Sequence, residues 1–260
     1  MTRLRLDRAL VERGLARSRG QAQELIRAGR VTLEGRDDLR PSDLVGEDDR
    51  LEARTDPYVS RAAHKLLGAL DDLGLHDVPA PGARVLDAGA STGGFTQVLL
   101  ERGAGEVHAV DVGTDQLAPL LRDDPRVRVH EQTNLRDLTL DLLDGRPVDL
   151  VVADVSFISL TLLLRRFVAV TTNDGTWLLM VKPQFEVGRA GLGRDGVVRD
   201  PALHRRAVDD VAAVAADLGW RVRGVAPSRL PGPAGNREFF LHLGRGASVG
   251  PGPARDSSLC

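Results

Sequence analysis

Two lysines, Lys65 and Lys182, stand out in a chain of 260 residues whose other 33 basic side chains are all arginines. Arginine keeps its proton in proteins, whereas a lysine ammonium can release its proton when it is buried or lies beside another cation. The two lysines are therefore candidates for titratable groups, one of which acts as a general base. The alternative is that a coding bias towards arginine left two lysines at arbitrary places. Their positions in the fold decide between these interpretations.

A second chemical signal is the segment VLDAGASTGGF, Val85 to Phe95, whose pattern is typical of a strand, a glycine turn and a helix start. Glycines let the backbone approach a ligand closely, and the free amides of a helix start can face that ligand. The spacing is not that of the dinucleotide motif GxGxxG. Asp111 ends the next predicted strand, where a carboxylate can accept hydrogen bonds from both hydroxyls of a ribose. Asp87 resembles the acid typical of methyltransferases that use S-adenosylmethionine (AdoMet).

We therefore predict an AdoMet site. A dinucleotide site is the lesser alternative, and a purely structural turn is the other. No metal is expected, since methyl transfer from a sulfonium needs no Lewis acid and the chain offers no clustered set of Cys and His. The residues predicted to bind AdoMet are Asp87, Gly89, Ala90, Ser91, Gly93, Gly94, Phe95, Asp111, Asn134 and Asp154.

The elements that position these residues alternate between strands and helices. Buried strands such as VDLVVADV imply an α/β fold with a mostly parallel, Rossmann-like sheet covered on both faces. A Pro/Gly loop joins the last two strands and predicts an antiparallel hairpin at the end of the sheet. Lys65 lies on a predicted helix at 60–74. Strands are predicted at 84–88, 106–111, 127–131, 148–153, 176–181, 221–226 and 237–243, and the clearest helices at 94–102, 156–170 and 201–218.

A small α+β module precedes this sheet. Residues 4–13 and the segment from Ser18, a predicted N-cap, to Gly29 have helical patterns, and short strands follow. About 55 residues make a marginal fold alone, so the module is predicted to be an appended domain. Residues 1–30 contain eight arginines and three acidic residues, which makes them a basic patch. This patch can bind RNA phosphates, or it can be a solvated surface with no ligand. The predicted RNA-binding residues are Arg3, Arg5, Arg17, Arg19, Arg27 and Arg30.

Five strings carry a family resemblance: SRAAHKL, LDAGASTGGFT, VVADVSFISL, VKPQFEVG and LPGPAGNREFF. Together they closely resemble the TlyA-type rRNA methyltransferase family, also known as haemolysins. The segment ARSRGQAQELIRAGRVTLEG resembles the S4-like RNA-binding domain, and the rest is similar to FtsJ-like ribose 2′-O-methyltransferases. The resemblance implies an S4-like domain at 1–55, a linker at 56–59 and an FtsJ-like AdoMet-dependent domain at 60–244. The Gly/Pro-rich tail 245–260 is predicted to be disordered.

The resemblance also implies a catalytic tetrad that uses both lysines. FtsJ-like enzymes have a Lys-Asp-Lys-Glu set, which falls here on Lys65, Asp154, Lys182 and Glu238. Lys182 ends a parallel strand, where open α/β sheets bind ligands, and is the expected general base. Asp154 is expected to orient it, Lys65 to act as a neighbouring cation that favours proton release, and Glu238 to hold Lys65 or the substrate hydroxyl.

Each of these residues has a structural alternative. The lysines are then solvated, Glu238 is a charge on an edge strand, and Asp154 caps the helix at 156–170. The aromatic side chains near the motifs are interpreted as core or pocket lining rather than as base-stacking platforms. These are Phe157, Phe185, Phe239 and Phe240.

The composition limits the cellular compartment and the classes of function that are expected. The chain has neither a signal-peptide pattern nor an apolar stretch near the roughly 18–20 residues of a membrane helix, so a cytoplasmic protein is expected. Its single cysteine, Cys260, excludes an internal disulfide framework. The resemblance implies a cytidine in ribosomal RNA, within ribosomal subunits, as the substrate. The short tail after Leu243 favours the large subunit over the small one. The rivals are a membrane-active haemolysin and a non-catalytic RNA-binding factor.

Overall fold

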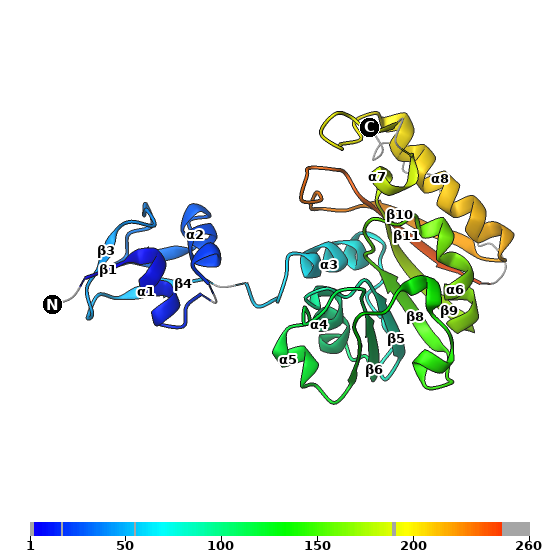
Figure 1. Cartoon of the computed structure of the whole chain (residues 1–260), viewed down its shortest axis with the longest axis horizontal. Coiled ribbons are helices and arrows are strands. Elements are labelled where there is room, and N and C mark those ends of the chain that lie inside the picture. Colours follow the sequence, from blue (N-terminus) through cyan, green and yellow to red (C-terminus); the bar gives the residue numbers. More distant parts are fainter. Residues whose placement is uncertain (1–2, 17, 55, 189–190, 246–260) are drawn as a thin grey trace. The chain divides into compact units, whose positions relative to one another are not determined.

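The computed structural model describes residues 3–16, 18–54, 56–188 and 191–245. The chain divides into two compact units, Met1–Pro57 and Tyr58–Cys260 (Figure 1). Arg17 and residues 246–260 of the predicted tail lie outside the described residues. Within the described ranges, no helix is long and apolar enough to cross a membrane.

The N-terminal unit packs two helices against short antiparallel strands. Ser18 caps the second helix, because its Oγ accepts a hydrogen bond from the Gln21 amide at 3.3 Å. This confirms the predicted cap and both predicted helices. Leu6 and Leu10 from the first helix and Leu25 from the second form part of its core. The elements are β1 (Leu4–Arg5), α1 (Leu6–Glu12), α2 (Arg19–Arg27), β2 (Val31–Leu33), β3 (Leu44–Val45) and β4 (Leu51–Ala53), with β1 paired to β3 and β2 to β4.

The C-terminal unit is built on a seven-stranded sheet of order β10-β11-β9-β8-β5-β6-β7. Its five strands from β9 to β7 are parallel, and β11 pairs antiparallel with both β9 and β10. The mostly parallel sheet and the antiparallel hairpin are therefore confirmed. The strand order reverses between β5 and β8, which is where open α/β sheets bind ligands. The strands are β5 (Arg84–Ala88), β6 (Glu106–Val110), β7 (Val127–His130), β8 (Val148–Ala153), β9 (Thr171–Val181), β10 (Arg221–Pro227) and β11 (Phe239–Gly244).

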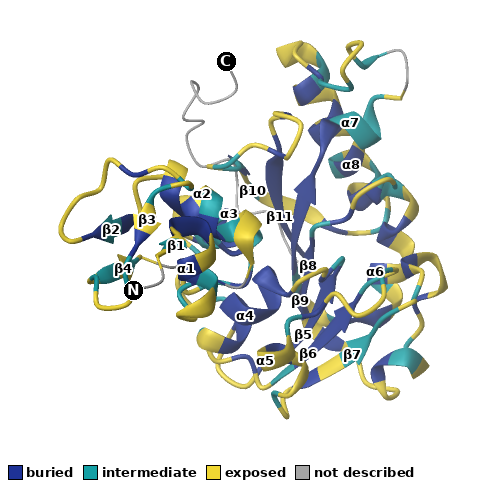
Figure 2. Ribbon diagram, turned by 60° about the vertical axis from the view of Figure 1, so that its left-hand side comes forward, coloured by how far each residue is buried: buried dark blue, intermediate teal, exposed yellow. Residues whose placement is uncertain are grey.

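Helices cover both faces of the sheet (Figure 2). Successive residues of a strand point to opposite faces of the sheet. On β5, Val85 packs in the cluster with α3, α4 and α5, whereas Leu86 packs in the cluster with α6 and α8. Both layers are buried, which explains why the strands read as continuous apolar runs. The helices are α3 (Ala62–Asp72), α4 (Gly94–Glu101), α5 (Pro119–Arg122), α6 (Leu164–Val170), α7 (Pro183–Glu186) and α8 (Pro201–Asp217), with short 3₁₀ helices η1 (Leu135–Asp137), η2 (Asp141–Leu143) and η3 (Leu160–Leu162).

The prediction of one helix over 156–170 is wrong. Residues 154–159 form a loop, followed by η3 and then α6. Phe157 has a φ of +66°, which a right-handed helix does not allow, and Ser159 rather than Asp154 caps η3. Glu186 accepts hydrogen bonds from Ser159 Oγ (2.5 Å) and the Leu160 amide (2.8 Å). A side chain 26 residues away in sequence therefore fixes the loop.

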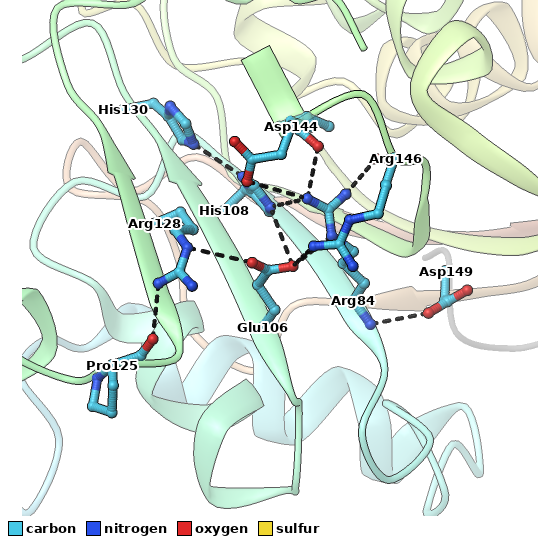
Figure 3. A network of polar contacts seen from close by, with 10 residues as sticks. Arg84, Glu106, His108, Pro125, Arg128, His130, Asp144, Arg146 and Asp149 are labelled. Carbon is cyan, nitrogen blue, oxygen red and sulfur yellow. Dashed lines mark hydrogen bonds and ion pairs between the residues drawn. The ribbon is translucent and has the colours of Figure 1, made fainter. Parts of the chain in front are cut away.

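A polar network joins the amino-terminal ends of β5 and β6 (Figure 3). The guanidinium of Arg84 donates to Glu106 Oε2 at 2.5 Å and to His108 Nε2 at 2.7 Å. His108 Nδ1 lies 2.9 Å from His130 Nε2. Since Arg84 must donate, His108 carries its hydrogen on Nδ1 and donates to His130. Glu106, His108 and Asp144 could offer metal ligand atoms, but a guanidinium already lies among them, so we interpret the cluster as an ion-pair network.

His108 makes stability depend on pH. Burial lowers its pKa to about 4, helped by the positive charge of Arg84. As pH falls through 6.5 the unfolded chain binds a proton here that the folded chain does not, so stability is lost towards acid pH. We expect the free energy of unfolding of wild type, relative to His108→Gln, to fall by about 2 kcal/mol between pH 7.5 and 5. Urea titrations at both pH values measure this, and a pH-independent difference would contradict it.

Candidate active site

A cavity of about 390 Å³ lies at the carboxyl ends of β5, β8 and β9. This volume is within the range of roughly 300–1,000 Å³ typical of small-molecule sites. The cavity joins the two sets of residues that the sequence singled out, the lysines and the glycine turn. The predicted residues that line it are Lys65, Gly89, Ala90, Ser91, Phe95, Asp154 and Lys182.

Lys182 follows the last residue of β9, and its ammonium group is held by two partners from the loop after β8. Lys182 Nζ lies 2.7 Å from Asp154 Oδ1 and 2.8 Å from Ser156 Oγ. The side chain is 10% exposed, so it is not a solvated surface lysine. Asp154 is fixed in turn by its backbone, since its amide donates to the Ala88 carbonyl at 3.0 Å. The carboxylate and the amine therefore meet because β8 and β9 are adjacent parallel strands.

Lys65 and Glu238 form a second ion pair, with Lys65 Nζ 2.6 Å from Glu238 Oε2. Lys65 comes from α3, and Glu238 directly precedes β11 and is 1% exposed, so it is not a charge on an open edge. A Cβ on Gly232 would lie 2.6 Å from Glu238 Oε1, which means that the loop before β11 runs directly over the carboxylate. Each lysine thus has its own carboxylate partner, and both line one cavity.

The glycine turn after β5 leaves no space for a side chain at Gly89. Its φ is +86°, and a Cβ there would lie 2.7 Å from the Asp154 carbonyl oxygen. At the next strand, Asp111 accepts hydrogen bonds from the Ser91 amide at 2.8 Å and the Gly113 amide at 2.7 Å. Asp111 therefore holds the turn in place beside the cavity, immediately after β6.

The remaining predicted cofactor residues lie outside the lining of the cavity. Asp87 is buried beneath the turn and accepts a hydrogen bond from Thr96 Oγ1 at 2.6 Å. Burial, with the nearby charges of Asp154 and Asp111, raises the pKa of Asp87 to about 7. A Cβ at Gly93 would clash with Leu121 of α5, and a Cβ at Gly94 would clash with the start of α3. Asn134 caps η1, because its side chain accepts from the Arg136 amide at 3.0 Å.

Sequence reasoning missed several residues of the cavity. They adjoin the predicted ones within the same strings, so proximity to a motif was the available signal. Phe157 was also misinterpreted, because its side chain is 91% exposed and contacts Phe185 at a ring distance of 5.4 Å rather than entering the core. Phe239 and Phe240 are buried, as predicted. The missed residues are Ser60, Arg61, Ala62, Thr92, Ser156, Pro231 and Pro233.

In the N-terminal unit, buried Asp7 organises part of the predicted basic patch. Its carboxylate accepts hydrogen bonds from Arg5 at 3.3 Å and from Arg19 at 2.8 Å. Burial alone would raise its pKa, but the hydrogen bonds from Arg19, Gln23 and Arg5 outweigh burial and lower it to about 2. Both guanidinium groups remain at least half exposed. Arg3, Arg27 and Arg30 are also exposed.

Known proteins share both units. Residues 58–245 match the FtsJ-like methyltransferase family, and residues 4–51 match the S4 domain. The chain is 53% identical over 244 residues to the 16S/23S rRNA (cytidine-2′-O)-methyltransferase TlyA of Mycobacterium tuberculosis, covering 93% of this chain and 90% of the relative. The chain belongs to the TlyA-type methyltransferase family. The family and the fold class predicted from the sequence are thereby confirmed.

Two further relatives span nearly the whole TlyA-type chain. The 23S rRNA (cytidine-2′-O)-methyltransferase TlyA of Campylobacter jejuni is 35% identical over 253 residues, which cover 89% of this chain and 96% of the relative. A solved structure of a presumed hemolysin from Streptococcus thermophilus is 37% identical, with a TM-score of 0.72, and covers 95% of this chain and 90% of its own. The similarity to these relatives thus extends over most of the chain.

Proposed function

We propose that this TlyA-type enzyme transfers a methyl group from AdoMet to the ribose 2′-hydroxyl of a cytidine in ribosomal RNA, with Lys182 as general base. The observation that carries the proposal is the pairing of Lys182 with Asp154 in a cavity that also contains the glycine turn. Family membership supplies the reaction class. The names of the two curated relatives share the 23S rRNA, so large-subunit RNA is the proposed target, and cytoplasmic ribosomes are the proposed location.

The cavity has features that fit AdoMet. Gly89 lines the cavity with backbone alone, and Asp111 adjoins the turn as a candidate partner for ribose hydroxyls. Ala90, Ser91 and Phe95 complete the proposed cofactor wall. When bound, AdoMet supplies an electrophilic methyl group on a sulfonium sulfur.

The chain's own residues then handle the proton of the nucleophile. A ribose 2′-hydroxyl is a weak nucleophile, so its proton must leave as its oxygen attacks, and Lys182 Nζ accepts that proton in this proposal. Asp154 orients the amine and compensates positive charge. Lys65, held by Glu238, contributes a second cation to the lining of the same cavity. Alignment of the hydroxyl within the cavity supplies a further part of the rate enhancement.

The N-terminal unit is proposed to hold the RNA backbone. Exposed arginines on the S4 domain can neutralise phosphates, which fixes register and orientation but carries little sequence information. The target nucleotide must leave the stack to bring its ribose into the cavity. The proposed phosphate contacts are Arg3, Arg5, Arg19, Arg27 and Arg30, together with Arg17, which lies outside the described residues.

Phe157 is a candidate platform for the displaced base. Phe157 is 91% exposed and directly follows Ser156, which lines the cavity. Stacking of a base on an aromatic ring contributes about 1–3 kcal/mol, so we expect Phe157→Ala to lower kcat/KM for RNA by roughly 5- to 150-fold. Leu162→Ala is the matched control, since Leu162 is also exposed, at 57%, and lies in the same segment. Equal effects of the two substitutions would contradict the stacking role.

The proposed function is tested by incubating purified protein and radiolabelled AdoMet separately with large and small ribosomal subunits. We expect label in large-subunit RNA, and resistance to alkaline cleavage at a single cytidine, because a methylated 2′-oxygen cannot attack the neighbouring phosphate. Label confined to small-subunit RNA would overturn the proposed target. Absence of label from both subunits would overturn the reaction and favour a non-catalytic RNA-binding factor.

A further inference from the structure

The Lys182 amine has a second close partner besides Asp154. Ser156 Oγ lies 2.8 Å from Lys182 Nζ, and this is the only hydrogen bond that the Ser156 side chain makes to a described residue. Ser156 does not cap η3, since Ser159 has that role. Its hydroxyl lines the cavity, whereas the neighbouring side chain of Val155 is buried. Among the described residues, the Ser156 hydroxyl therefore contacts the Lys182 amine and supports no other part of the fold.

The number of hydrogens on the Lys182 amine determines how this contact can orient its lone pair. A neutral lysine amine has two N–H bonds and one lone pair, and only the lone pair can accept the proton of a 2′-hydroxyl. An ionised carboxylate such as that of Asp154 can only accept hydrogen bonds, and its Oδ1 lies in ion-pair contact with Nζ at 2.7 Å, so we expect it to face one N–H. If Ser156 Oγ accepts the other, the lone pair has a single remaining direction. Without the serine, the amine rotates about its Cε–Nζ bond and the lone pair samples several directions.

We propose that Ser156 is a positioning residue that directs the lone pair of Lys182 into the cavity. This inference rests on the proposed function, in which Lys182 is the base. The loop geometry supports it, because Ser156 is held between a buried residue and Phe157, whose φ is +66°. Glu186 anchors the same loop through Ser159 at 2.5 Å. The backbone that carries the Ser156 hydroxyl is thus held in place by contacts of the residues before and after it.

The test measures single-turnover methyl transfer by Ser156→Ala and Ser156→Thr as a function of pH. For Ser156→Ala we expect a plateau rate roughly 10- to 100-fold lower, since misorientation of a reacting group has effects of this order. KM for AdoMet and RNA should stay within about twofold, because bound substrates keep their contacts. The rising limb of the pH profile should move to lower pH, because the hydroxyl no longer stabilises the ammonium form. Ser156→Thr, which keeps a hydroxyl, should recover most of the rate.

Ser42→Ala is the matched control, since it removes the same hydroxyl from an exposed residue of the N-terminal unit and should behave as wild type. A wild-type plateau and pH profile in Ser156→Ala would overturn the inference. A loss of rate with raised KM and an unmoved pH profile would overturn it too, since that pattern marks a substrate contact. Retained activity in Lys182→Arg would overturn the proposed function itself, whereas an inactive Lys182→Arg beside a fully active Ser156→Ala overturns the role of Ser156 alone.

Discussion

Lys182→Arg is expected to lower the rate of methyl transfer to ribosomal RNA by about 10²- to 10⁴-fold while AdoMet binding stays within about threefold. The first figure is the usual contribution of a general base, and arginine keeps the positive charge but does not release its proton. Charge and approximate length are conserved, so the ion pair with Asp154 can still form. The loss therefore isolates proton acceptance from electrostatics. Single-turnover transfer at saturating AdoMet and calorimetric titration of AdoMet measure the two quantities.

The reverse exchange at a surface site provides the control. Arg165→Lys changes the same two residue types at an exposed position of α6 and should leave both quantities unchanged. If Lys182→Arg kept more than about a tenth of the wild-type rate, a guanidinium would suffice at this place. Lys182 would then act by charge, and the general-base assignment would be wrong.

Gly89→Ala is expected to remove AdoMet binding and to destabilise the C-terminal unit by about 2–4 kcal/mol. Two costs combine here. A residue with a Cβ at positive φ costs roughly 1–2 kcal/mol, and the new Cβ would lie 2.7 Å from the Asp154 carbonyl oxygen, which is backbone and cannot rotate away. Relief of that clash must move the turn or the loop that carries Asp154. Either movement opens the cavity between the cofactor wall and the base.

Gly145→Ala separates the two costs. Gly145 has a φ of +70°, but nothing lies within 4 Å of where its Cβ would be, so it carries the conformational cost without the clash. We expect Gly145→Ala to destabilise by only about 1–2 kcal/mol and to bind AdoMet normally. Urea unfolding and AdoMet titration of both variants decide the matter. If both variants were destabilised equally and both bound AdoMet normally, the close approach between Gly89 and the Asp154 carbonyl would have no role.

The sequence predicted the sheet well because its signals are local. Buried strands such as β8 read as unbroken apolar runs, and the Pro/Gly loop before β11 marks a hairpin. The tetrad residues could be named because each adjoins a distinctive string, yet their pairing depends on strand adjacency. Lys182 and Ser156 are 26 residues apart, and no pattern within either string shows that they touch. That contact follows from the parallel register of β8 and β9.

The errors have the same origin. Residues 156–170 carry a helical pattern, but hydrogen bonds from Glu186, on a separate helix, hold the first part as a loop. Apolar type suggested burial for Phe157, whereas the positive φ turns it outward. In each case a contact across the fold or a backbone angle decides the local structure. The propensities of single residues indicate neither.

The position of β11 in the sheet bears on how the enzyme matures. This strand is the last of the sheet to be synthesised, yet it lies between β9 and β10, both of which leave the ribosome before it. Until β11 inserts, Lys65 lacks its carboxylate, because Glu238 directly precedes that strand. A nascent chain can therefore form the glycine turn and the Lys182–Asp154 pair well before its tetrad is complete. The proposed tetrad is therefore completed only by the final strand, so a partly translated chain lacks one of its four side chains.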